Sequence, residues 1–204
     1  MNKRLSIPGT RSLDASLDTT DSEMAIVACP PHPQFDGDRH DSRLEAVSDS
    51  LLGAGVDCLR FDYGPWDEGN AEQTDVHRAV AWARDRYDRV GLFGFSFGAS
   101  MAILAASSAA EGSTPDVLSA LAPAAQVTNE KDVCTSLDTL AVPTQVVYGE
   151  RDDTATWKPV VDRARDNGVA VRSFPADHFF VGQQAKVAGV VSEFLVNHLR
   201  AESP

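Results

Sequence analysis

The chain has 204 residues, of which 43% are hydrophobic and 24% are charged, the composition of a globular protein with a sizeable core. Its net charge is −12, with 21 Asp and 9 Glu against 14 Arg and 4 Lys, which argues against nucleic-acid binding because phosphate backbones are also negative. No apolar run approaches the roughly 18 residues that a membrane-spanning helix needs, so we expect no membrane partner. The length of the chain predicts a single domain over residues 1–204.

Alternating apolar and amphipathic segments dominate the chain. In chain order we expect edge strands at Arg4–Pro8 and Arg11–Asp18, a strand at Met24–Cys29, a helix at Arg39–Gly53, a strand at Val56–Phe61, a helix at Glu72–Tyr87, a strand at Arg89–Phe95, a helix at Phe97–Ala110, strands at Asp116–Leu121 and Val142–Tyr148, a helix at Thr156–Asn167, a strand at Val169–Phe174 and a helix at Gln183–Leu199. This order predicts βαβ units with right-handed crossovers. The expected fold is an α/β three-layer sandwich with a mostly parallel, doubly wound sheet, whose ligands bind at the carboxyl ends of the strands.

The first twelve residues, MNKRLSIPGTRS, lack the apolar stretch of a signal peptide. The three cysteines show no CxxC spacing, so we expect neither a disulfide framework nor a metal site. Together these features predict a cytoplasmic protein with reduced thiols. The Asp-rich, Lys-poor surface fits a salt-adapted protein and an ordinary acidic one equally, and the oligomeric state is not readable.

Ser96 stands in GFSFG, between an apolar strand and an Ala-rich helix. This G-x-S-x-G spacing is typical of a nucleophile on a sharp strand-to-helix turn, where Gly94 and Gly98 leave room for close backbone contact. A serine that only caps the helix is the alternative. The spacing is not G-x-G-x-x-G, and no Gly-Lys-Ser/Thr follows, which excludes the phosphate-loop interpretations.

A serine nucleophile needs a base and an orienting carboxylate. His178 follows the last strand at the carboxyl edge of the sheet, whereas His32 lies in another loop at this edge and is not excluded by position. The segment YGERDDT offers Asp152 as the acid, with Asp153 in reserve. Ser96, Asp152 and His178 then follow the Ser, acid, His chain order of α/β hydrolases.

These segments resemble the α/β-hydrolase superfamily over about Met24 to Leu199. GFSFGAS is similar to its nucleophile turn, YGERDDT to its acid loop and ADHFF to its histidine loop. CPPHPQFDG followed by LRFDYGPWDEG resembles the small, lidless, dienelactone-hydrolase-like members, although Pro30 replaces the first histidine of their His-Pro-His-Pro-like loop. Dienelactone hydrolases use a cysteine nucleophile, so Ser96 argues against dienelactone as the substrate.

An oxyanion hole requires two N–H donors. We expect one from the backbone of Phe97 and the other from PPHPQFDG, where Gln34 is the first choice and Phe35 the alternative, because proline has no N–H.

Only residues 122–141 separate two predicted strands at the place where related folds insert a lid, which leaves room for a short helix at most. We therefore expect an open, shallow pocket. The candidate pocket walls are Tyr63, Trp66, Phe97, Val133, Trp157 and Phe179, although each of these side chains taken alone is better explained as core packing.

The sequence thus predicts a serine hydrolase of small carboxylic esters or thioesters that acts through an acyl-enzyme, without metal or organic cofactor. Its activity should fall at acid pH as His178 protonates. The alternative is a non-catalytic binding protein that retains the fold.

Overall fold

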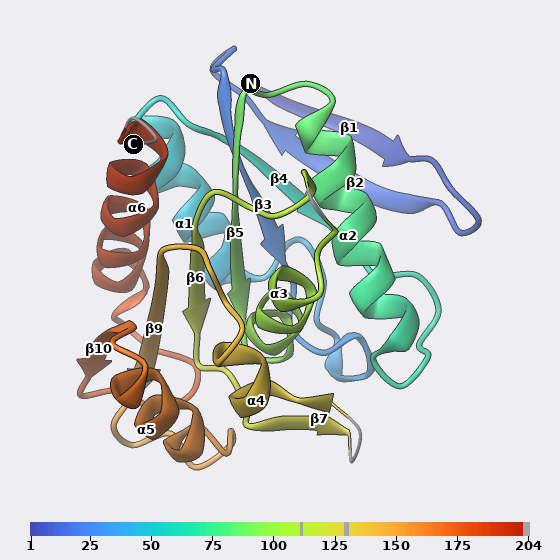
Figure 1. Ribbon diagram of the computed structural model, residues 1–204. Coiled ribbons are helices and arrows are strands. Elements are labelled where there is room, and N and C mark those ends of the chain that lie inside the picture. The colour runs from blue at the N-terminus through green and yellow to red at the C-terminus, as the bar shows by residue number, and fades with distance from the viewer. Residues whose placement is uncertain (111, 129–130, 202–204) are drawn as a thin grey trace.

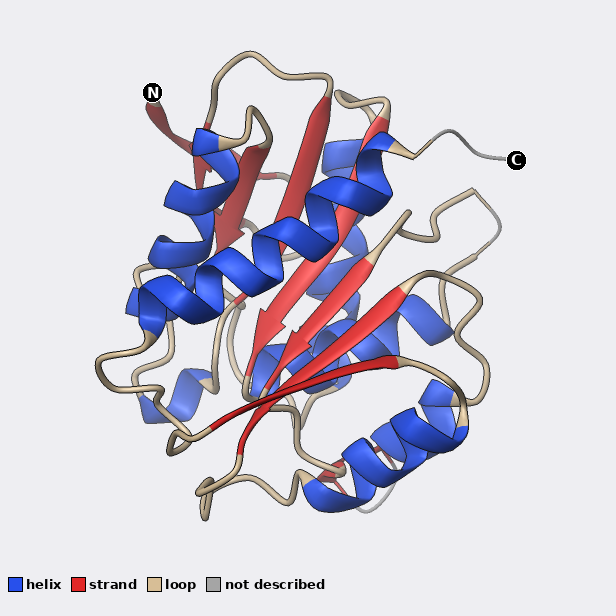
Figure 2. Cartoon of the chain, turned by 90° about the vertical axis from the view of Figure 1, so that its left-hand side faces the viewer, coloured by secondary structure: helices blue, strands red, loops and turns tan. Residues whose placement is uncertain are grey.

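An eight-stranded sheet organises the chain in a computed structural model that describes residues 1–110, 112–128 and 131–201 (Figures 1 and 2). Its strands are β1 (Asn2–Ile7), β2 (Leu13–Asp18), β3 (Met24–Cys29), β4 (Asp57–Phe61), β5 (Arg89–Phe95), β6 (Leu118–Leu121), β9 (Thr144–Gly149) and β10 (Ala170–Phe174). They lie in the order β1-β2-β4-β3-β5-β6-β9-β10, in which β1, β2 and β4 pair antiparallel and the rest pair parallel. The predicted mostly parallel α/β sheet is confirmed.

Helices cover both faces of this sheet (Figure 1). The helices are η1 (Pro33–Phe35), α1 (Ser42–Gly53), α2 (Asn70–Arg84), α3 (Phe97–Ser107), α4 (Val133–Leu137), α5 (Lys158–Asp166) and α6 (Gln184–Arg200). The core under α1 and α6 contains Leu44, Phe93 and Leu195, and the core under α2 to α5 contains Val76, Ile103 and Val161. Because both faces are buried, β3 and β5 are apolar along nearly their whole length.

Helix α1 begins later than the sequence predicted. The Asp41 side chain accepts a hydrogen bond from the Arg43 N–H and so caps the helix, which begins at Ser42 instead of Arg39. The Arg39 N–H donates instead to Asp62 Oδ1 at 2.7 Å, and its guanidinium pairs with the same carboxylate. The segment after η1 is thereby attached to the loop after β4.

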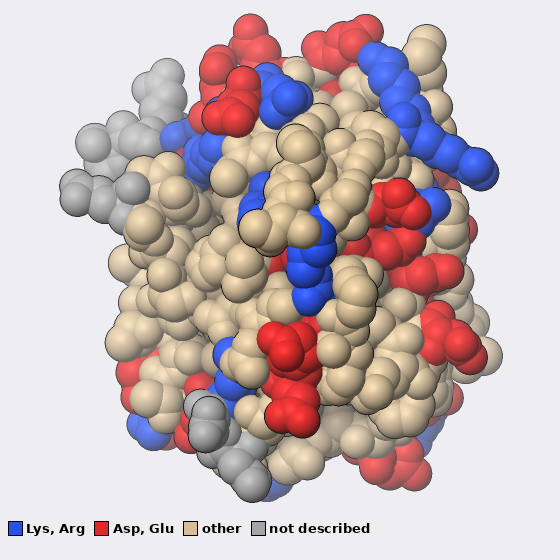
Figure 3. Space-filling model, turned by 90° about the vertical axis from the view of Figure 1, so that its right-hand side faces the viewer, with Lys and Arg blue, Asp and Glu red and all other residues tan. Residues whose placement is uncertain are grey.

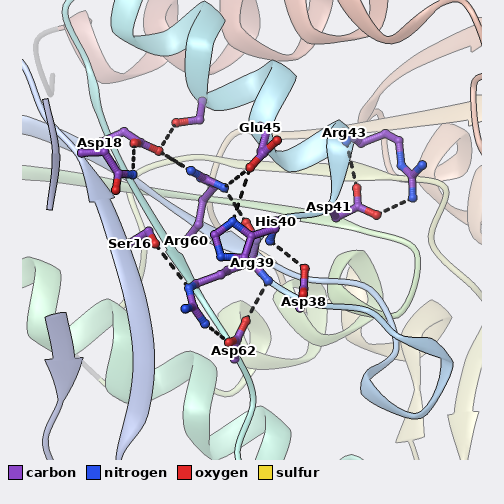
Figure 4. A network of polar contacts seen from close by, with 12 residues as sticks. Ser16, Asp18, Asp38, Arg39, His40, Asp41, Arg43, Glu45, Arg60 and Asp62 are labelled. Carbon is purple, nitrogen blue, oxygen red and sulfur yellow. Dashed lines mark hydrogen bonds and ion pairs between the residues drawn. The ribbon is translucent and has the colours of Figure 1, made fainter. Parts of the chain in front are cut away.

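A buried ion-pair network joins β2, β4 and α1 (Figure 4). Arg60 Nε donates to Asp18 Oδ2 at 2.9 Å, and Arg60 Nη1 lies 3.3 Å from Glu45 Oε1. The Ser48 hydroxyl also donates to Asp18 Oδ2, at 2.8 Å. Such partners are needed because a buried charge without a partner is strongly destabilising.

The segment between β6 and β9 contains more structure than the short helix expected from the sequence. Strands β7 (Gln126–Thr128) and β8 (Lys131–Asp132) form an antiparallel pair, and α4 follows directly. Residues 129–130 lie outside the described part of the chain. Gln126 and Val127 of β7 lie at the carboxyl edge of the sheet, in the same cavity wall as Ser96.

On the face of the molecule seen in Figure 3, Asp and Glu side chains form several clusters with Lys and Arg between them. Within the described ranges, no helix is long and apolar enough to cross a membrane.

Candidate active site

Four loops at the carboxyl edge of the parallel strands bring the predicted residues together. Ser96 follows β5, Asp152 follows β9, His178 follows β10 and His32 follows β3. All four strands belong to the parallel part of the sheet, so their carboxyl ends meet at one edge.

Ser96 occupies a backbone conformation that side chains rarely adopt, with φ 56° and ψ −121°. Its N–H donates to the carbonyl of Leu121 at 2.8 Å, which anchors the turn to β6. Gly94 and Gly98 permit this turn, because a β-carbon on Gly94 would lie 2.2 Å from the Gly98 carbonyl oxygen. Helix α3 begins directly after Ser96, and its first N–H groups, starting with Phe97, have no partner within the helix. The serine hydroxyl therefore stands at a site that favours negative charge.

The side chains of Ser96, His178 and Asp152 form one hydrogen-bonded chain. His178 Nε2 lies 2.9 Å from Ser96 Oγ, and His178 Nδ1 lies 2.7 Å from Asp152 Oδ2. His178 and Asp152 are buried, with 3% and 8% of their surfaces exposed. A carboxylate at Nδ1 places the ring proton there and leaves Nε2 free to accept the serine proton.

The Asp152 carboxylate is held by its own loop. Its Oδ1 accepts the N–H groups of Thr154 and Ala155, both at 2.9 Å. Burial acts to raise the pKa of Asp152, but the hydrogen bonds from His178 and these two amides outweigh it, so the pKa lies below its usual value. The carboxyl group is therefore ionised at neutral pH. Asp153, the reserve candidate, is exposed.

Of the other histidines, only His32 reaches this site. His32 and Ser96 line the same cavity, whereas His40 pairs with Glu45. His77 lies 3.3 Å from the Ser108 hydroxyl on the α2–α3 surface, and His198 contacts the Phe194 carbonyl within α6.

The two residues predicted as the second oxyanion donor both donate their N–H groups within the η1 turn. The Gln34 N–H, the first choice from the sequence, donates to His32 Nδ1 at 3.2 Å. The Phe35 N–H donates to the His32 carbonyl at 3.0 Å. Both amides are therefore occupied within the η1 turn, and Gln34 does not line the cavity. The sequence could not reveal that the histidine beside them caps this turn.

A cavity of about 200 Å³ lies beside Ser96. Its walls are His32, Phe35, Ser96, Phe97, Ser100, Ala124, Gln126, Val127, Thr154, Ala155 and His178. None of these carries a carboxylate, an ammonium or a guanidinium group. An engineered cavity of about 150 Å³ can hold benzene, so this one is suited to a small uncharged group.

Most of the expected wall residues lie elsewhere. Phe97 lines the cavity, but Tyr63 is buried behind it with ring centroids 5.6 Å apart. Trp66 contacts His32 at 4.5 Å between ring centroids but does not line the cavity. Phe179 is 49% exposed, with its ring against His178 on the outside.

Val133 and Trp157, the remaining expected wall residues, also do not line the cavity. Val133 is fully buried, and Trp157 stacks on Tyr148. Ser100, which was not among the predicted site residues, also lines the cavity. Its hydroxyl donates to the carbonyl of Ala124 and accepts the N–H of Ala124, which fixes one wall. A serine in the first turn of an Ala-rich helix was the only signal available.

Among residues 1–110, 112–128 and 131–201, no group of three or more His, Cys, Asp or Glu side chains is arranged to hold a metal ion.

Solved structures share this architecture over nearly the whole chain. An α/β serine hydrolase without a lid from Xanthomonas campestris matches with a TM-score of 0.84 at 24% identity, covering 99% of this chain and 97% of that one. An esterase from Pyrococcus furiosus gives 0.84 at 18% identity, with 98% and 92% covered. A dienelactone hydrolase from Anabaena variabilis gives 0.80 at 19% identity, with 98% and 99% covered. No protein-family model and no curated protein matches the sequence. The chain therefore has the α/β-hydrolase fold.

Proposed function

We propose that this protein is a serine hydrolase that cleaves small carboxylic esters or thioesters through an acyl-enzyme. The observation that carries the proposal is the hydrogen-bonded chain from Ser96 through His178 to Asp152, placed at the amino end of α3. The solved structures with the same fold include serine hydrolases and esterases, which supports the same class of reaction.

In the acylation step, Ser96 Oγ bonds to the carbonyl carbon while its proton passes to His178 Nε2. The Phe97 N–H, free at the start of α3, donates to the carbonyl oxygen as it becomes negative. When the tetrahedral intermediate collapses, the bond to the leaving group breaks. The departing alkoxide or thiolate takes the proton from His178 and leaves with it.

Deacylation repeats these steps with water. His178 Nε2 takes a proton from water while the water oxygen bonds to the acyl carbon. When this second intermediate collapses, the bond from Ser96 Oγ to the acyl carbon breaks and Ser96 Oγ takes the proton from His178. Asp152 stays ionised throughout and stabilises the imidazolium, in accord with its lowered pKa.

The cavity beside Ser96 supports a small, uncharged acyl group as the part of the substrate that is held. Its volume is below the roughly 300–1,000 Å³ of drug-sized sites. We also propose that the protein works in the reducing cytoplasm, which the three free cysteines, two of them buried, support. Its partner there would be a small-molecule ester.

A fluorophosphonate probe tests the proposal, because it labels only an activated serine. We expect labelling of the wild type and hydrolysis of p-nitrophenyl acetate and butyrate. Ser96→Ala should abolish labelling and lower kcat by a factor on the order of 10⁶. Ser107→Ala, at the far end of the same helix, is the matched control and should react normally. A folded wild type that takes no label would instead indicate a binding protein.

A further inference from the structure

Three backbone N–H groups of the loop after β3 donate hydrogen bonds within the loop. The amides of Gln34, Phe35 and Gly37 all donate to His32, the first to the ring and the other two to the carbonyl oxygen. The prolines of the loop have no N–H. A carbonyl substrate at Ser96 would therefore find the predicted second donor, Gln34, already bonded.

His32 brings a different donor to the cavity. Its imidazole lines the cavity together with Ser96. The ring is packed among three aromatic side chains, with centroid distances of 4.5 Å to Trp66, 4.7 Å to Phe97 and 5.0 Å to Phe35. Such packing restricts the ring to few orientations.

The hydrogen bond from Gln34 decides the tautomer of His32. A backbone N–H can only donate, so Nδ1 must accept at 3.2 Å and the ring proton must lie on Nε2. The two ring nitrogens point in diverging directions, so Nε2–H is directed away from the η1 turn. No described residue accepts a hydrogen bond from Nε2, which leaves this donor available.

The neutral ring is also the favoured form. Burial lowers the pKa of His32, although the negative charge of Glu72 acts in the opposite direction. The His178 imidazole lines the same cavity and gains a proton during acylation, which further disfavours a second positive charge there.

We propose that the His32 side chain is a catalytic residue whose Nε2–H is the second oxyanion donor, in place of a backbone amide. The inference rests on the proposed function. His32 donates a hydrogen bond to the substrate carbonyl oxygen opposite the Phe97 N–H and keeps its proton throughout, so no bond is formed or broken at the ring. Neutral histidine is among the side chains able to stabilise an oxyanion.

The competing explanation is that His32 only caps the η1 turn, and two substitutions separate the roles. His32→Asn keeps an acceptor close to the position of Nδ1 and can still accept the Gln34 N–H, as asparagine does in Asx turns. Its amide group is too short to replace Nε2–H. His32→Gln has the opposite properties, because its amide nitrogen reaches the position of Nε2 while the acceptor at Nδ1 is lost.

The kinetics of both variants test the inference on p-nitrophenyl butyrate, after thermal melting and circular dichroism have shown them folded. We expect His32→Asn to lose about 10²–10³ in kcat with little change in KM, the usual cost of one oxyanion donor. His32→Gln should stay within about tenfold of the wild type. The reverse order of the two variants would show a capping role only. Two variants of normal activity would assign the donor to a backbone amide, and either result overturns the proposal.

Failure of the proposed function gives a different pattern. In that case the wild type takes no fluorophosphonate label and hydrolyses no ester. If the wild type is labelled and active while the His32 variants behave contrary to expectation, only the role of His32 is refuted.

Discussion

A β-carbon built on Gly98 would lie 2.2 Å from the carbonyl oxygen of Cys29. The first turn of α3 therefore rests directly on the backbone at the end of β3, without a side chain between them. The next atom such a β-carbon would meet is the Pro30 carbonyl oxygen at 2.4 Å, so the close contact extends into the loop that carries His32.

Gly98→Ala should therefore impair both stability and activity. The atoms in the way belong to the backbone and cannot rotate aside, so we expect a loss of about 1–3 kcal/mol in the free energy of unfolding. We also expect a larger relative loss in the rate of the proposed ester hydrolysis, because Ser96 is displaced. Urea unfolding and kinetics on one preparation measure both. Gly189→Ala, in α6 with open space around it, is the control and should be neutral or stabilising by up to about 1 kcal/mol. Equal effects of the two substitutions would contradict the role given to Gly98.

The two neighbouring aspartates of the acid loop should differ sharply. Asp152→Asn removes the charge beside His178 Nδ1 and presents an amide that favours the wrong tautomer, so kcat should fall by about 10⁴. Asp153→Asn changes an exposed side chain and should leave kcat unchanged. A similar loss in both variants would show that the acid has been misassigned.

The elements that the sequence predicted well are those with continuous apolar patterns. Met24–Cys29 and Arg89–Phe95 match β3 and β5 because each is buried on both faces and bounded by polar or turn residues. The chain order of Ser96, Asp152 and His178 was readable because each residue directly follows a strand or its turn.

Contacts between loops could not be predicted from the pattern of apolar and polar residues. The pair β7–β8 consists of strands of three and two residues, too short to show a period of two. The hydrogen bond from the Gln34 N–H to His32 depends on a side-chain rotamer, and the placement of Tyr63 behind Phe97 depends on how two loops pack in space. Sequence spacing carries neither kind of information.

Asp57 should make stability depend on pH in the acid range. Its burial acts to raise the pKa, but hydrogen bonds from Thr19, Thr20 and Tyr87 outweigh it and lower the pKa in the folded state. A lowered folded pKa means that the carboxylate stabilises the fold above its unfolded pKa of about 3.9, and that this contribution is lost as pH falls through the folded value.

We therefore expect Asp57→Asn to cost about 1–3 kcal/mol at pH 7, and the difference from the wild type to shrink towards pH 3. Urea titrations at a series of pH values measure it. Asp49→Asn, on the exposed side of α1, should show no such dependence. A deficit in Asp57→Asn that is the same at every pH would rule out the linkage.

The net charge of −12 predicts a response to salt. Mutual repulsion among acidic side chains is screened as the Debye length falls from about 10 Å at 0.1 M to 3 Å at 1 M. We expect the melting temperature to rise over that range with sodium chloride. Equal stability in dilute buffer and in molar salt would show that the acidic surface is not an adaptation to salt.

The two edge strands of the sheet carry cations in a chain whose acidic side chains outnumber its basic ones. Lys3 and Arg4 are exposed on β1, and Arg172 is exposed on β10. Strands at a sheet edge present unpaired N–H and C=O groups to which another chain can add. If two copies met β1 to β1, in any register that brings Lys3 and Arg4 of both copies opposite each other, like charges would face across the new ladder and destabilise it. Positive charges at both open edges of the sheet thus act against its growth into a sheet shared between copies at high protein concentration.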